Sequence, residues 1–238
     1  MTAGSPTQLV VLALVVVGAA GLSLAARRWP GPWRTQAARS LALLLVLSEA
    51  SWWVYAADHR LPLSVALPLH LCDVAPLVLA VALLTRRQAW LEVAYFWGLG
   101  GCGVAMLTPV LPDLPGSFLF NQYVAEHGLA VIAAVFLPLG LGFRPSRAAV
   151  GRAALATASL ALVAGVADFL TGGNYMSLAR PPDAPTLISV LSPWPWYLLE
   201  LAGIVLVVLV LLYVPFRLLR GGVDLAPAGS SLGQEVRQ

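Results

Sequence analysis

Residues 66–84 read ALPLHLCDVAPLVLAVALL, an apolar run long enough to cross a membrane that nevertheless carries ionisable side chains. His70, Cys72 and Asp73 lie within four positions of one another near its start. Ionisable groups at membrane depth cost free energy, so they usually face a cavity and usually serve a function. This run therefore predicts both a membrane-embedded fold and a candidate site within it.

The composition of the whole chain indicates the same class of protein. It has 238 residues, of which 59% are hydrophobic and 11% are charged. No water-soluble domain needs so much apolar surface, so we predict an all-α, polytopic membrane protein in the cell membrane. All 14 basic residues are arginines, which excludes a retinal protein, because the Schiff base of that class needs a lysine amine.

Seven apolar runs separated by Pro, Gly and Arg predict seven transmembrane helices. We expect residues 1–220 to form a single bundle and residues 221–238, rich in Gly, Ser and Ala, to be a disordered cytoplasmic tail. The predicted spans are 8–26, 37–57, 66–84, 89–108, 124–143, 149–170 and 197–219.

The arginines predict the orientation of this bundle. They cluster in the first, third and fifth connections and after the last span, whereas the other connections hold one at most. The excess of arginine in cytoplasmic loops places the N-terminus outside and the C-terminus in the cytoplasm. Because the arginines belong to short loops between spans, they do not indicate a nucleic-acid partner.

In this orientation, the polar side chains of five spans and one loop gather in the outer half of the membrane. Such convergence is the main sign of a site, because each group alone has a simpler explanation. The residues concerned are Glu49, His70, Cys72, Asp73, Glu126, His127, Asp168, Asn174, Tyr175 and Glu200.

The simpler explanations differ by residue type. Glu49 or Glu200 alone is explained by snorkelling or by a partner arginine in an outer loop. Asp168 alone is explained by capping of the backbone at the end of its span. Cys72 alone is a small buried hydrophobe and His70 alone an interhelical hydrogen bond.

Helix geometry limits the chemistry of the 70–73 run. Residues two apart do not share a face, so His70 is a poor base for Cys72, and His127 of the fifth span is the candidate at matching depth. With Asp73 or Glu126 orienting an imidazole, this set has the nucleophile–base–orienter logic of acyl transfer. Zinc is the rival use of these side chains, and it is disfavoured because the chain has no matching pair of metal ligands on a second helix.

Several short elements stand out along the chain: LPLHLC at 67–72, EVAYFWGLGG at 92–101, TP at 108–109, HG at 127–128, NYM at 174–176 and PWPWY at 193–197. They resemble the YwaF-like family of bacterial integral membrane proteins over residues 40–215. A related eukaryotic family, transmembrane protein 164, is described as a cysteine-dependent acyltransferase acting on ether phospholipids. That resemblance implies that Cys72 accepts the acyl group, with His70 or His127 as its partner.

We therefore expect a membrane acyltransferase or transacylase that acts on membrane lipids in the outer leaflet and needs no cofactor. Asn174 is the expected oxyanion donor, and Asn174, Tyr175, Glu49 and Glu126 are expected to contact the substrate. Two alternatives stay open: a proton-coupled transporter or solute-binding protein, and a structural or accessory membrane protein. Cys102 lies among glycines that suit close helix packing, so we interpret it as structural.

Overall fold

The computed structural model describes residues 1–109, 115–182 and 187–220, and the described residues are helical or irregular, without a β-strand. The predicted tail at 221–238 lies outside the described residues. The helices are α1 (Pro6–Arg28), α2 (Trp33–Asp58), α3 (Leu63–Ala66), α4 (Leu71–Thr85), α5 (Gln88–Trp97), the π-helix η1 (Gly98–Gly103), α6 (Val104–Leu107), α7 (Phe118–Leu141), α8 (Ala149–Thr171), the 3-10 helices η2 (Tyr175–Ser177) and η3 (Leu187–Val190), and α9 (Tyr197–Arg220).

Six of the predicted spans match helical runs that are long and apolar enough to cross a membrane: α1, α2, the continuous run Gln88–Leu107, α7, α8 and α9. The third predicted span does not. Its helix, α4, has only 15 residues, about 22 Å at 1.5 Å per residue. The structure therefore supports six full-length spans and one short apolar helix.

The third span is short because its first residues cannot join the helix. Pro68 disfavours helical conformation in the residue before it, and Leu67 has ψ 138°, in the extended region. The chain stays non-helical until His70, which caps α4 with φ −75° and ψ 152°. His70 therefore lies at the helix terminus, and not within a helix as the sequence predicted.

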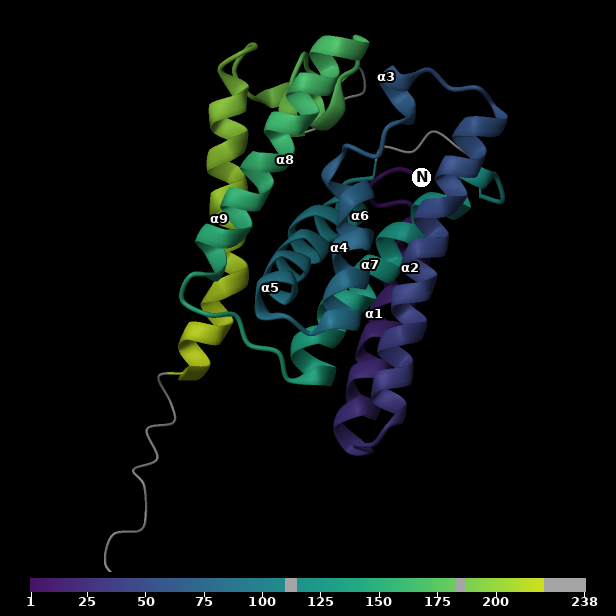
Figure 1. Cartoon of the computed structure of the whole chain (residues 1–238), viewed down its shortest axis with the longest axis vertical. Coiled ribbons are helices and arrows are strands. Elements are labelled where there is room, and N and C mark those ends of the chain that lie inside the picture. Colours follow the sequence, from purple (N-terminus) through teal and green to yellow (C-terminus); the bar gives the residue numbers. More distant parts are fainter. Residues whose placement is uncertain (110–114, 183–186, 221–238) are drawn as a thin grey trace, which may run out of the picture.

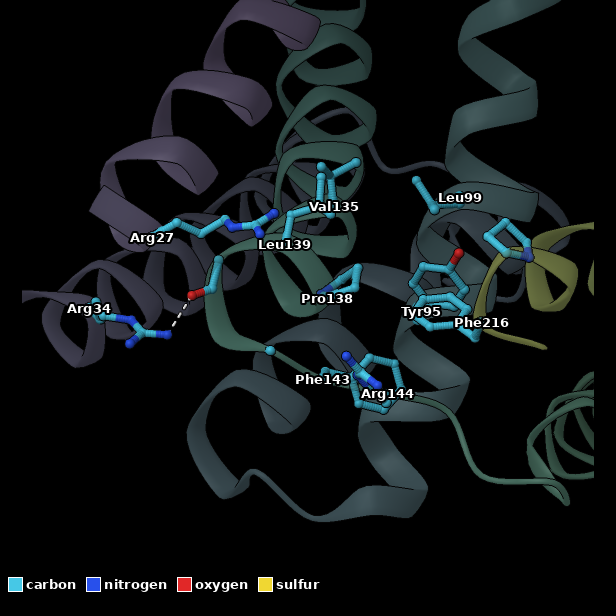
Figure 2. A pocket seen from close by; sticks show the side chains of 13 residues that line it. Arg27, Arg34, Tyr95, Leu99, Val135, Pro138, Leu139, Phe143, Arg144 and Phe216 are labelled. Atoms are coloured by element: carbon cyan, nitrogen blue, oxygen red, sulfur yellow. Dashed lines mark hydrogen bonds between the residues drawn. The ribbon is translucent and has the colours of Figure 1, made fainter. Parts of the chain in front are cut away.

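Successive long elements run in alternating directions, and α4 takes its place in the alternation (Figure 1). We call the end of the bundle that holds α3 the α3 end. The opposite end, called the arginine end, holds Arg27, Arg34, Arg86 and Arg144. A cavity at the arginine end has Arg27 and Arg34 on one side and Tyr95 with Phe216 on the other (Figure 2).

The core lies where α4, α5 and α7 meet. Leu79, Phe96 and Phe136 are fully buried there, and α2 packs against α4 while α1 packs against α7. The outer helices keep large apolar side chains exposed, such as Phe169 of α8 and Leu211 of α9. An apolar exterior around a packed core is what lipid as a solvent requires.

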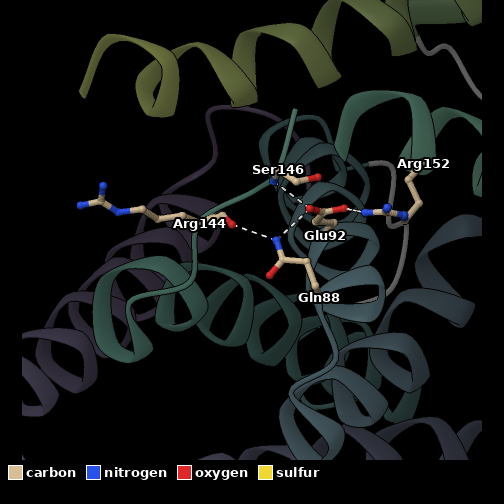
Figure 3. Close-up of polar contacts among 5 residues, drawn as sticks. All are labelled: Gln88, Glu92, Arg144, Ser146 and Arg152. Atoms are coloured by element: carbon tan, nitrogen blue, oxygen red, sulfur yellow. Dashed lines mark hydrogen bonds and ion pairs between the residues drawn. The ribbon is translucent and has the colours of Figure 1, made fainter. Parts of the chain in front are cut away.

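An ion pair between a buried glutamate and a partly exposed arginine joins α5 to α8. Glu92 is fully buried, and one of its carboxylate oxygens pairs with the Arg152 guanidinium. The other oxygen accepts hydrogen bonds from the Ser146 amide at 2.7 Å and from the Gln88 side chain at 2.8 Å (Figure 3). The carboxylate is therefore satisfied on both oxygens, as a buried charge must be.

The π-helix η1 brings the middle of the bundle together. A Cβ on Gly98 would lie 2.6 Å from the Ala134 Cβ atom and 3.2 Å from the Ala130 carbonyl oxygen of α7. Only glycine allows the two backbones to approach so closely. This contact holds η1, and with it Cys102, against α7.

Candidate active site

Cys72 lies in the first turn of α4, as its second residue. The helix start is fixed by Asp73, whose Oδ2 atom accepts a hydrogen bond of 3.0 Å from the His70 amide. Cys72 is half-buried as a residue. The positive end of the helix dipole favours negative charge at this position.

His127 of α7 lies beside this thiol. The Cys72 thiol interacts electrostatically with the His127 ring and with the Cys102 thiol. The His127 Nδ1 atom is 3.0 Å from the Tyr123 carbonyl oxygen, and a carbonyl can only accept. Nδ1 therefore carries the proton, so in the neutral ring the other nitrogen, Nε2, is free to accept one.

Tyr123 supports His127 in a second way. Its ring stacks on the imidazole with 4.1 Å between the ring centroids, and its hydroxyl donates to the Ala105 carbonyl at 2.7 Å. The sequence assigned the orienting role to Asp73 or Glu126. The structure instead gives His127 a backbone carbonyl as orienter, because that group lies one helical turn earlier on the same helix.

Cys102 is a further member of this cluster that the sequence interpreted as structural. It is fully buried in η1, its Sγ atom is 4.0 Å from the Cys72 carbonyl oxygen, and its thiol neighbours the Cys72 thiol. The glycines around it were the available signal, because they allow the π-helical turn that brings Cys102 to α4.

Two buried carboxylates border the cluster. Glu49 of α2 accepts a 2.8 Å hydrogen bond from the Trp53 indole on one oxygen, and Glu126 accepts one from the Gln122 amide. The second oxygen of each, Glu49 Oε2 and Glu126 Oε1, is buried and has no hydrogen-bond partner among the described residues. Glu49 thus neither snorkels nor pairs with an arginine.

These carboxylates belong to the same electrostatic environment as the thiol. Asp73 interacts with both Glu49 and Glu126, and Glu126 with His127. The structure therefore brings together Glu49, Asp73, Glu126 and His127 with Cys72 at one place. Three helices, α2, α4 and α7, supply them.

Tyr175 ties the loop after α8 to the segment before α4. Its amide donates to Asp168 Oδ1 at 2.6 Å, and its hydroxyl donates to the Leu63 carbonyl at 2.5 Å and accepts from the Leu67 amide at 3.0 Å. Burial raises the pKa of Tyr175, which keeps the phenol protonated as a donor. Asp168 thus accepts a hydrogen bond from the Tyr175 amide. The Tyr175 hydroxyl uses its donor and an acceptor to hold the segment before α4.

The same loop holds His70. Its Nδ1 atom accepts a 3.2 Å hydrogen bond from the Met176 amide, and its ring meets the Tyr175 ring edge-on at 5.4 Å. Met176 and Ser177 have φ 53° and 56°, a left-handed conformation that costs about 1–3 kcal/mol per residue. This strained turn directs the Met176 amide towards the exposed His70 ring.

Asn174, the expected oxyanion donor, is engaged within its own loop. Its Oδ1 atom accepts from the amides of Ala179 and Arg180 at 3.2 and 3.1 Å, and its Nδ2 atom donates to the Arg180 carbonyl at 3.0 Å. The side chain therefore folds the loop. Glu200 is exposed and bonds to Ser192, apart from the cluster.

A metal centre has no support within the described ranges. No three His, Cys, Asp or Glu side chains of residues 1–109, 115–182 and 187–220 lie close enough together to hold a metal ion.

The fold defines the class of protein: an all-helical membrane protein with several apolar helices long enough to cross a membrane. The chain belongs to the TMEM164 family, whose sequence model matches residues 3–213. Of the two resemblances in the sequence, this match supports the one to transmembrane protein 164, and the YwaF-like relationship stays a prediction.

An uncharacterized protein of Treponema pallidum (strain Nichols) is similar to this chain. The two are 29% identical over 151 residues, which is 63% of this chain and 62% of the relative's own length. No solved structure matches the chain.

Proposed function

We propose that this protein transfers acyl groups between membrane lipids through a thioester on Cys72, as a multi-pass protein of the cell membrane. In this proposal α4 is the third of seven crossings, the N-terminus is outside, and the α3 end faces the outer leaflet. The arginines at the opposite end support this orientation through the positive-inside rule.

One observation carries the proposal: Cys72, in the first turn of α4, interacts electrostatically with an imidazole whose free nitrogen is Nε2. A thiol needs a neighbouring base to become a nucleophile, and we assign that role to His127. The Tyr123 carbonyl holds the tautomer that makes Nε2 the base.

The reaction balances with these two residues alone. Cys72 Sγ attacks the ester carbonyl of a phospholipid while His127 Nε2 takes the thiol proton. The ester C–O bond breaks, and the leaving glycerol oxygen takes that proton from His127. The hydroxyl of a second lipid then attacks the thioester, giving its proton through His127 to the departing Cys72 sulfur.

The amides of the first turn of α4 are the donors that we assign to the developing oxyanion. Those of Leu71 and Cys72 precede any intrahelical acceptor, and neither has a hydrogen-bond partner among the described residues. Backbone donors at a helix start suit an oxyanion beside the sulfur. They replace Asn174, whose amide is used in its loop.

Labelling with a lipid-shaped, thiol-reactive probe tests the proposal. The wild type and the matched control Cys102→Ser are expected to carry label at residue 72, and Cys72→Ser to carry none. In bilayers with an acyl-labelled phospholipid and a lysophospholipid acceptor, the wild type is expected to transfer the acyl group and Cys72→Ser is expected not to. Equal labelling or equal transfer by Cys72→Ser contradicts the thioester route.

The unpartnered oxygens of Glu49 and Glu126 support a second candidate, proton-coupled binding of a small solute. More carboxylates border the thiol than acyl transfer needs. Uptake into proteoliposomes that disappears in Asp73→Asn and survives in Cys72→Ala would favour this function over the first. Retained uptake in Asp73→Asn argues against it.

A further inference from the structure

The arginine end holds a cavity that the acyl-transfer proposal does not use. Its volume is about 750 Å³, and it opens between the last turns of α1 and α7, the start of α2, and α9 (Figure 2). Charged, aromatic and aliphatic side chains share its lining, which includes Arg27, Arg34, Tyr95, Phe143, Arg144 and Phe216.

The charge of this cavity is one-sided. Three guanidinium groups line it and no carboxylate does. Arg34 donates one hydrogen bond of 2.5 Å, to the Gly140 carbonyl, and its Nε atom is buried without a partner among the described residues. Among the residues that the structure describes, the side chains of Arg27 and Arg144 have neither a hydrogen bond nor a carboxylate partner.

A neighbouring hollow extends the positive region. It has a volume of about 350 Å³, shares Arg34 with the cavity, and adds Arg39 and Arg86. Burial and the nearby Arg34 guanidinium lower the pKa of Arg86, as expected where positive charges face each other without a counter-ion. An anion placed among these side chains would relieve that repulsion.

The opposite wall is apolar and adjoins an apolar hollow. The Tyr95 ring packs edge-on against Phe216 at 5.5 Å, and its hydroxyl is satisfied by the Leu212 carbonyl at 3.1 Å. Leu99 lines both this cavity and an apolar hollow of about 450 Å³, which is bordered by α1, η1, α6 and α9 and also lined by Val131 and Leu212. The arginine-lined cavity thus lies next to an apolar hollow whose lining suits a hydrocarbon chain.

The positive-inside rule alone explains why arginines lie at this end. It does not explain why three of them line one cavity with an aromatic wall, or why an apolar hollow shares Leu99 with that cavity. A ligand with a phosphate at one end and a hydrocarbon chain at the other satisfies both parts.

We propose that this cavity binds the phosphate of an anionic glycerophospholipid from the leaflet at the arginine end, with one acyl chain in the apolar hollow beside Leu99. The lipid is a bound ligand of the bundle, separate from any substrate at Cys72. Arg27, Arg34 and Arg144 contact the phosphate, and Tyr95 and Phe216 cover the glycerol region.

Native mass spectrometry of the full-length protein in detergent tests this site, with phosphatidylglycerol titrated against phosphatidylcholine of the same chains. The wild type is expected to retain phosphatidylglycerol preferentially. The double variant Arg27→Gln/Arg144→Gln is expected to bind it about 30-fold more weakly, at about tenfold per 1.4 kcal/mol and about 1 kcal/mol per arginine. Both side chains are exposed, so the variant keeps its fold.

The control double variant Arg28→Gln/Arg147→Gln removes the same number of positive charges from neighbouring positions in the sequence. Neither Arg28 nor Arg147 lines the cavity or the hollow that shares Arg34 with it. It is expected to bind within about threefold of the wild type, because only general attraction is lost. Equal loss in both double variants, or equal retention of the two lipids by the wild type, overturns the proposal. Full competition by glycerol 3-phosphate at the concentration of the lipid also overturns it, since the hydrocarbon chain would then contribute nothing.

Discussion

His127 and Tyr123 are joined twice, through the 3.0 Å contact between the imidazole Nδ1 atom and the Tyr123 carbonyl oxygen and through the stacking of their rings. Both partners lie on α7, one helical turn apart. The imidazole is therefore held in one orientation by its own helix. The nearby carboxylates of Asp73 and Glu126 are therefore not needed to orient the imidazole, and they influence it through their charge.

This relationship predicts different outcomes for the two histidines near Cys72. His127→Gln removes the base, and we expect the second-order rate of Cys72 labelling to fall by about 100-fold or more. His70→Gln removes a ring whose Nδ1 atom is bonded to the Met176 amide, and we expect a change of less than about fivefold. Labelling kinetics over time measure both, and a larger effect of His70→Gln would assign the base to His70.

Tyr175 is expected to matter for stability through its hydroxyl. Tyr175→Phe leaves the Leu63 carbonyl and the Leu67 amide without their partner, at a cost of about 1–3 kcal/mol in the free energy of unfolding. Tyr213→Phe is the matched control, because the Tyr213 hydroxyl is buried without a partner among the described residues. Thermal unfolding in detergent should separate the two, with only Tyr175→Phe melting several degrees lower.

The Glu92–Arg152 pair predicts a further loss of stability. Glu92→Gln leaves the Arg152 guanidinium, whose side chain is 39% exposed, without its charge partner, which we expect to cost about 1–2 kcal/mol. Glu200→Gln serves as control, since Glu200 is exposed and its bonds go to Ser192. If both variants unfold at the wild-type temperature, α5 and α8 do not depend on this pair.

Gly98 is expected to tolerate no side chain. In Gly98→Ala the new Cβ atom meets the Ala134 Cβ atom at 2.6 Å, so η1 must move away from α7, at a cost of about 1–3 kcal/mol. Gly21→Ala in α1 adds a methyl group with nothing within 4 Å and is expected to be neutral or stabilising. Thermal unfolding compares the two, and Cys72 labelling shows whether the shift of Cys102 reaches the thiol.

Much of this architecture could be predicted from hydropathy. Runs of apolar residues are local features, and six of them matched helices long enough to cross a membrane. The third run gave a wrong prediction because its apolar residues continue through 67–70, where the backbone is not helical. Hydropathy reports the solvent around a segment and not its backbone conformation.

Cys72, His127, Asp73, Glu49 and Glu126 share one electrostatic environment in the structure, and their role as a site stays a prediction. The role of Tyr123 depends on a backbone carbonyl, which no side-chain pattern reports. The hydrogen bonds of Asn174 depend on the conformation of residues 174–180. The position of Cys102 depends on a π-helical turn, which the glycine-rich composition permits but does not specify.

The shortness of α4 bears on how a lipid would reach Cys72. Its 15 residues span about 22 Å, against a hydrocarbon thickness of about 30 Å. If its far end sits at the bilayer surface, the thiol lies several ångströms below the level of neighbouring ester bonds. In the proposed reaction the bilayer would therefore be thinned locally above Cys72, which would bring the ester bonds of the lipid substrate down to the level of the sulfur.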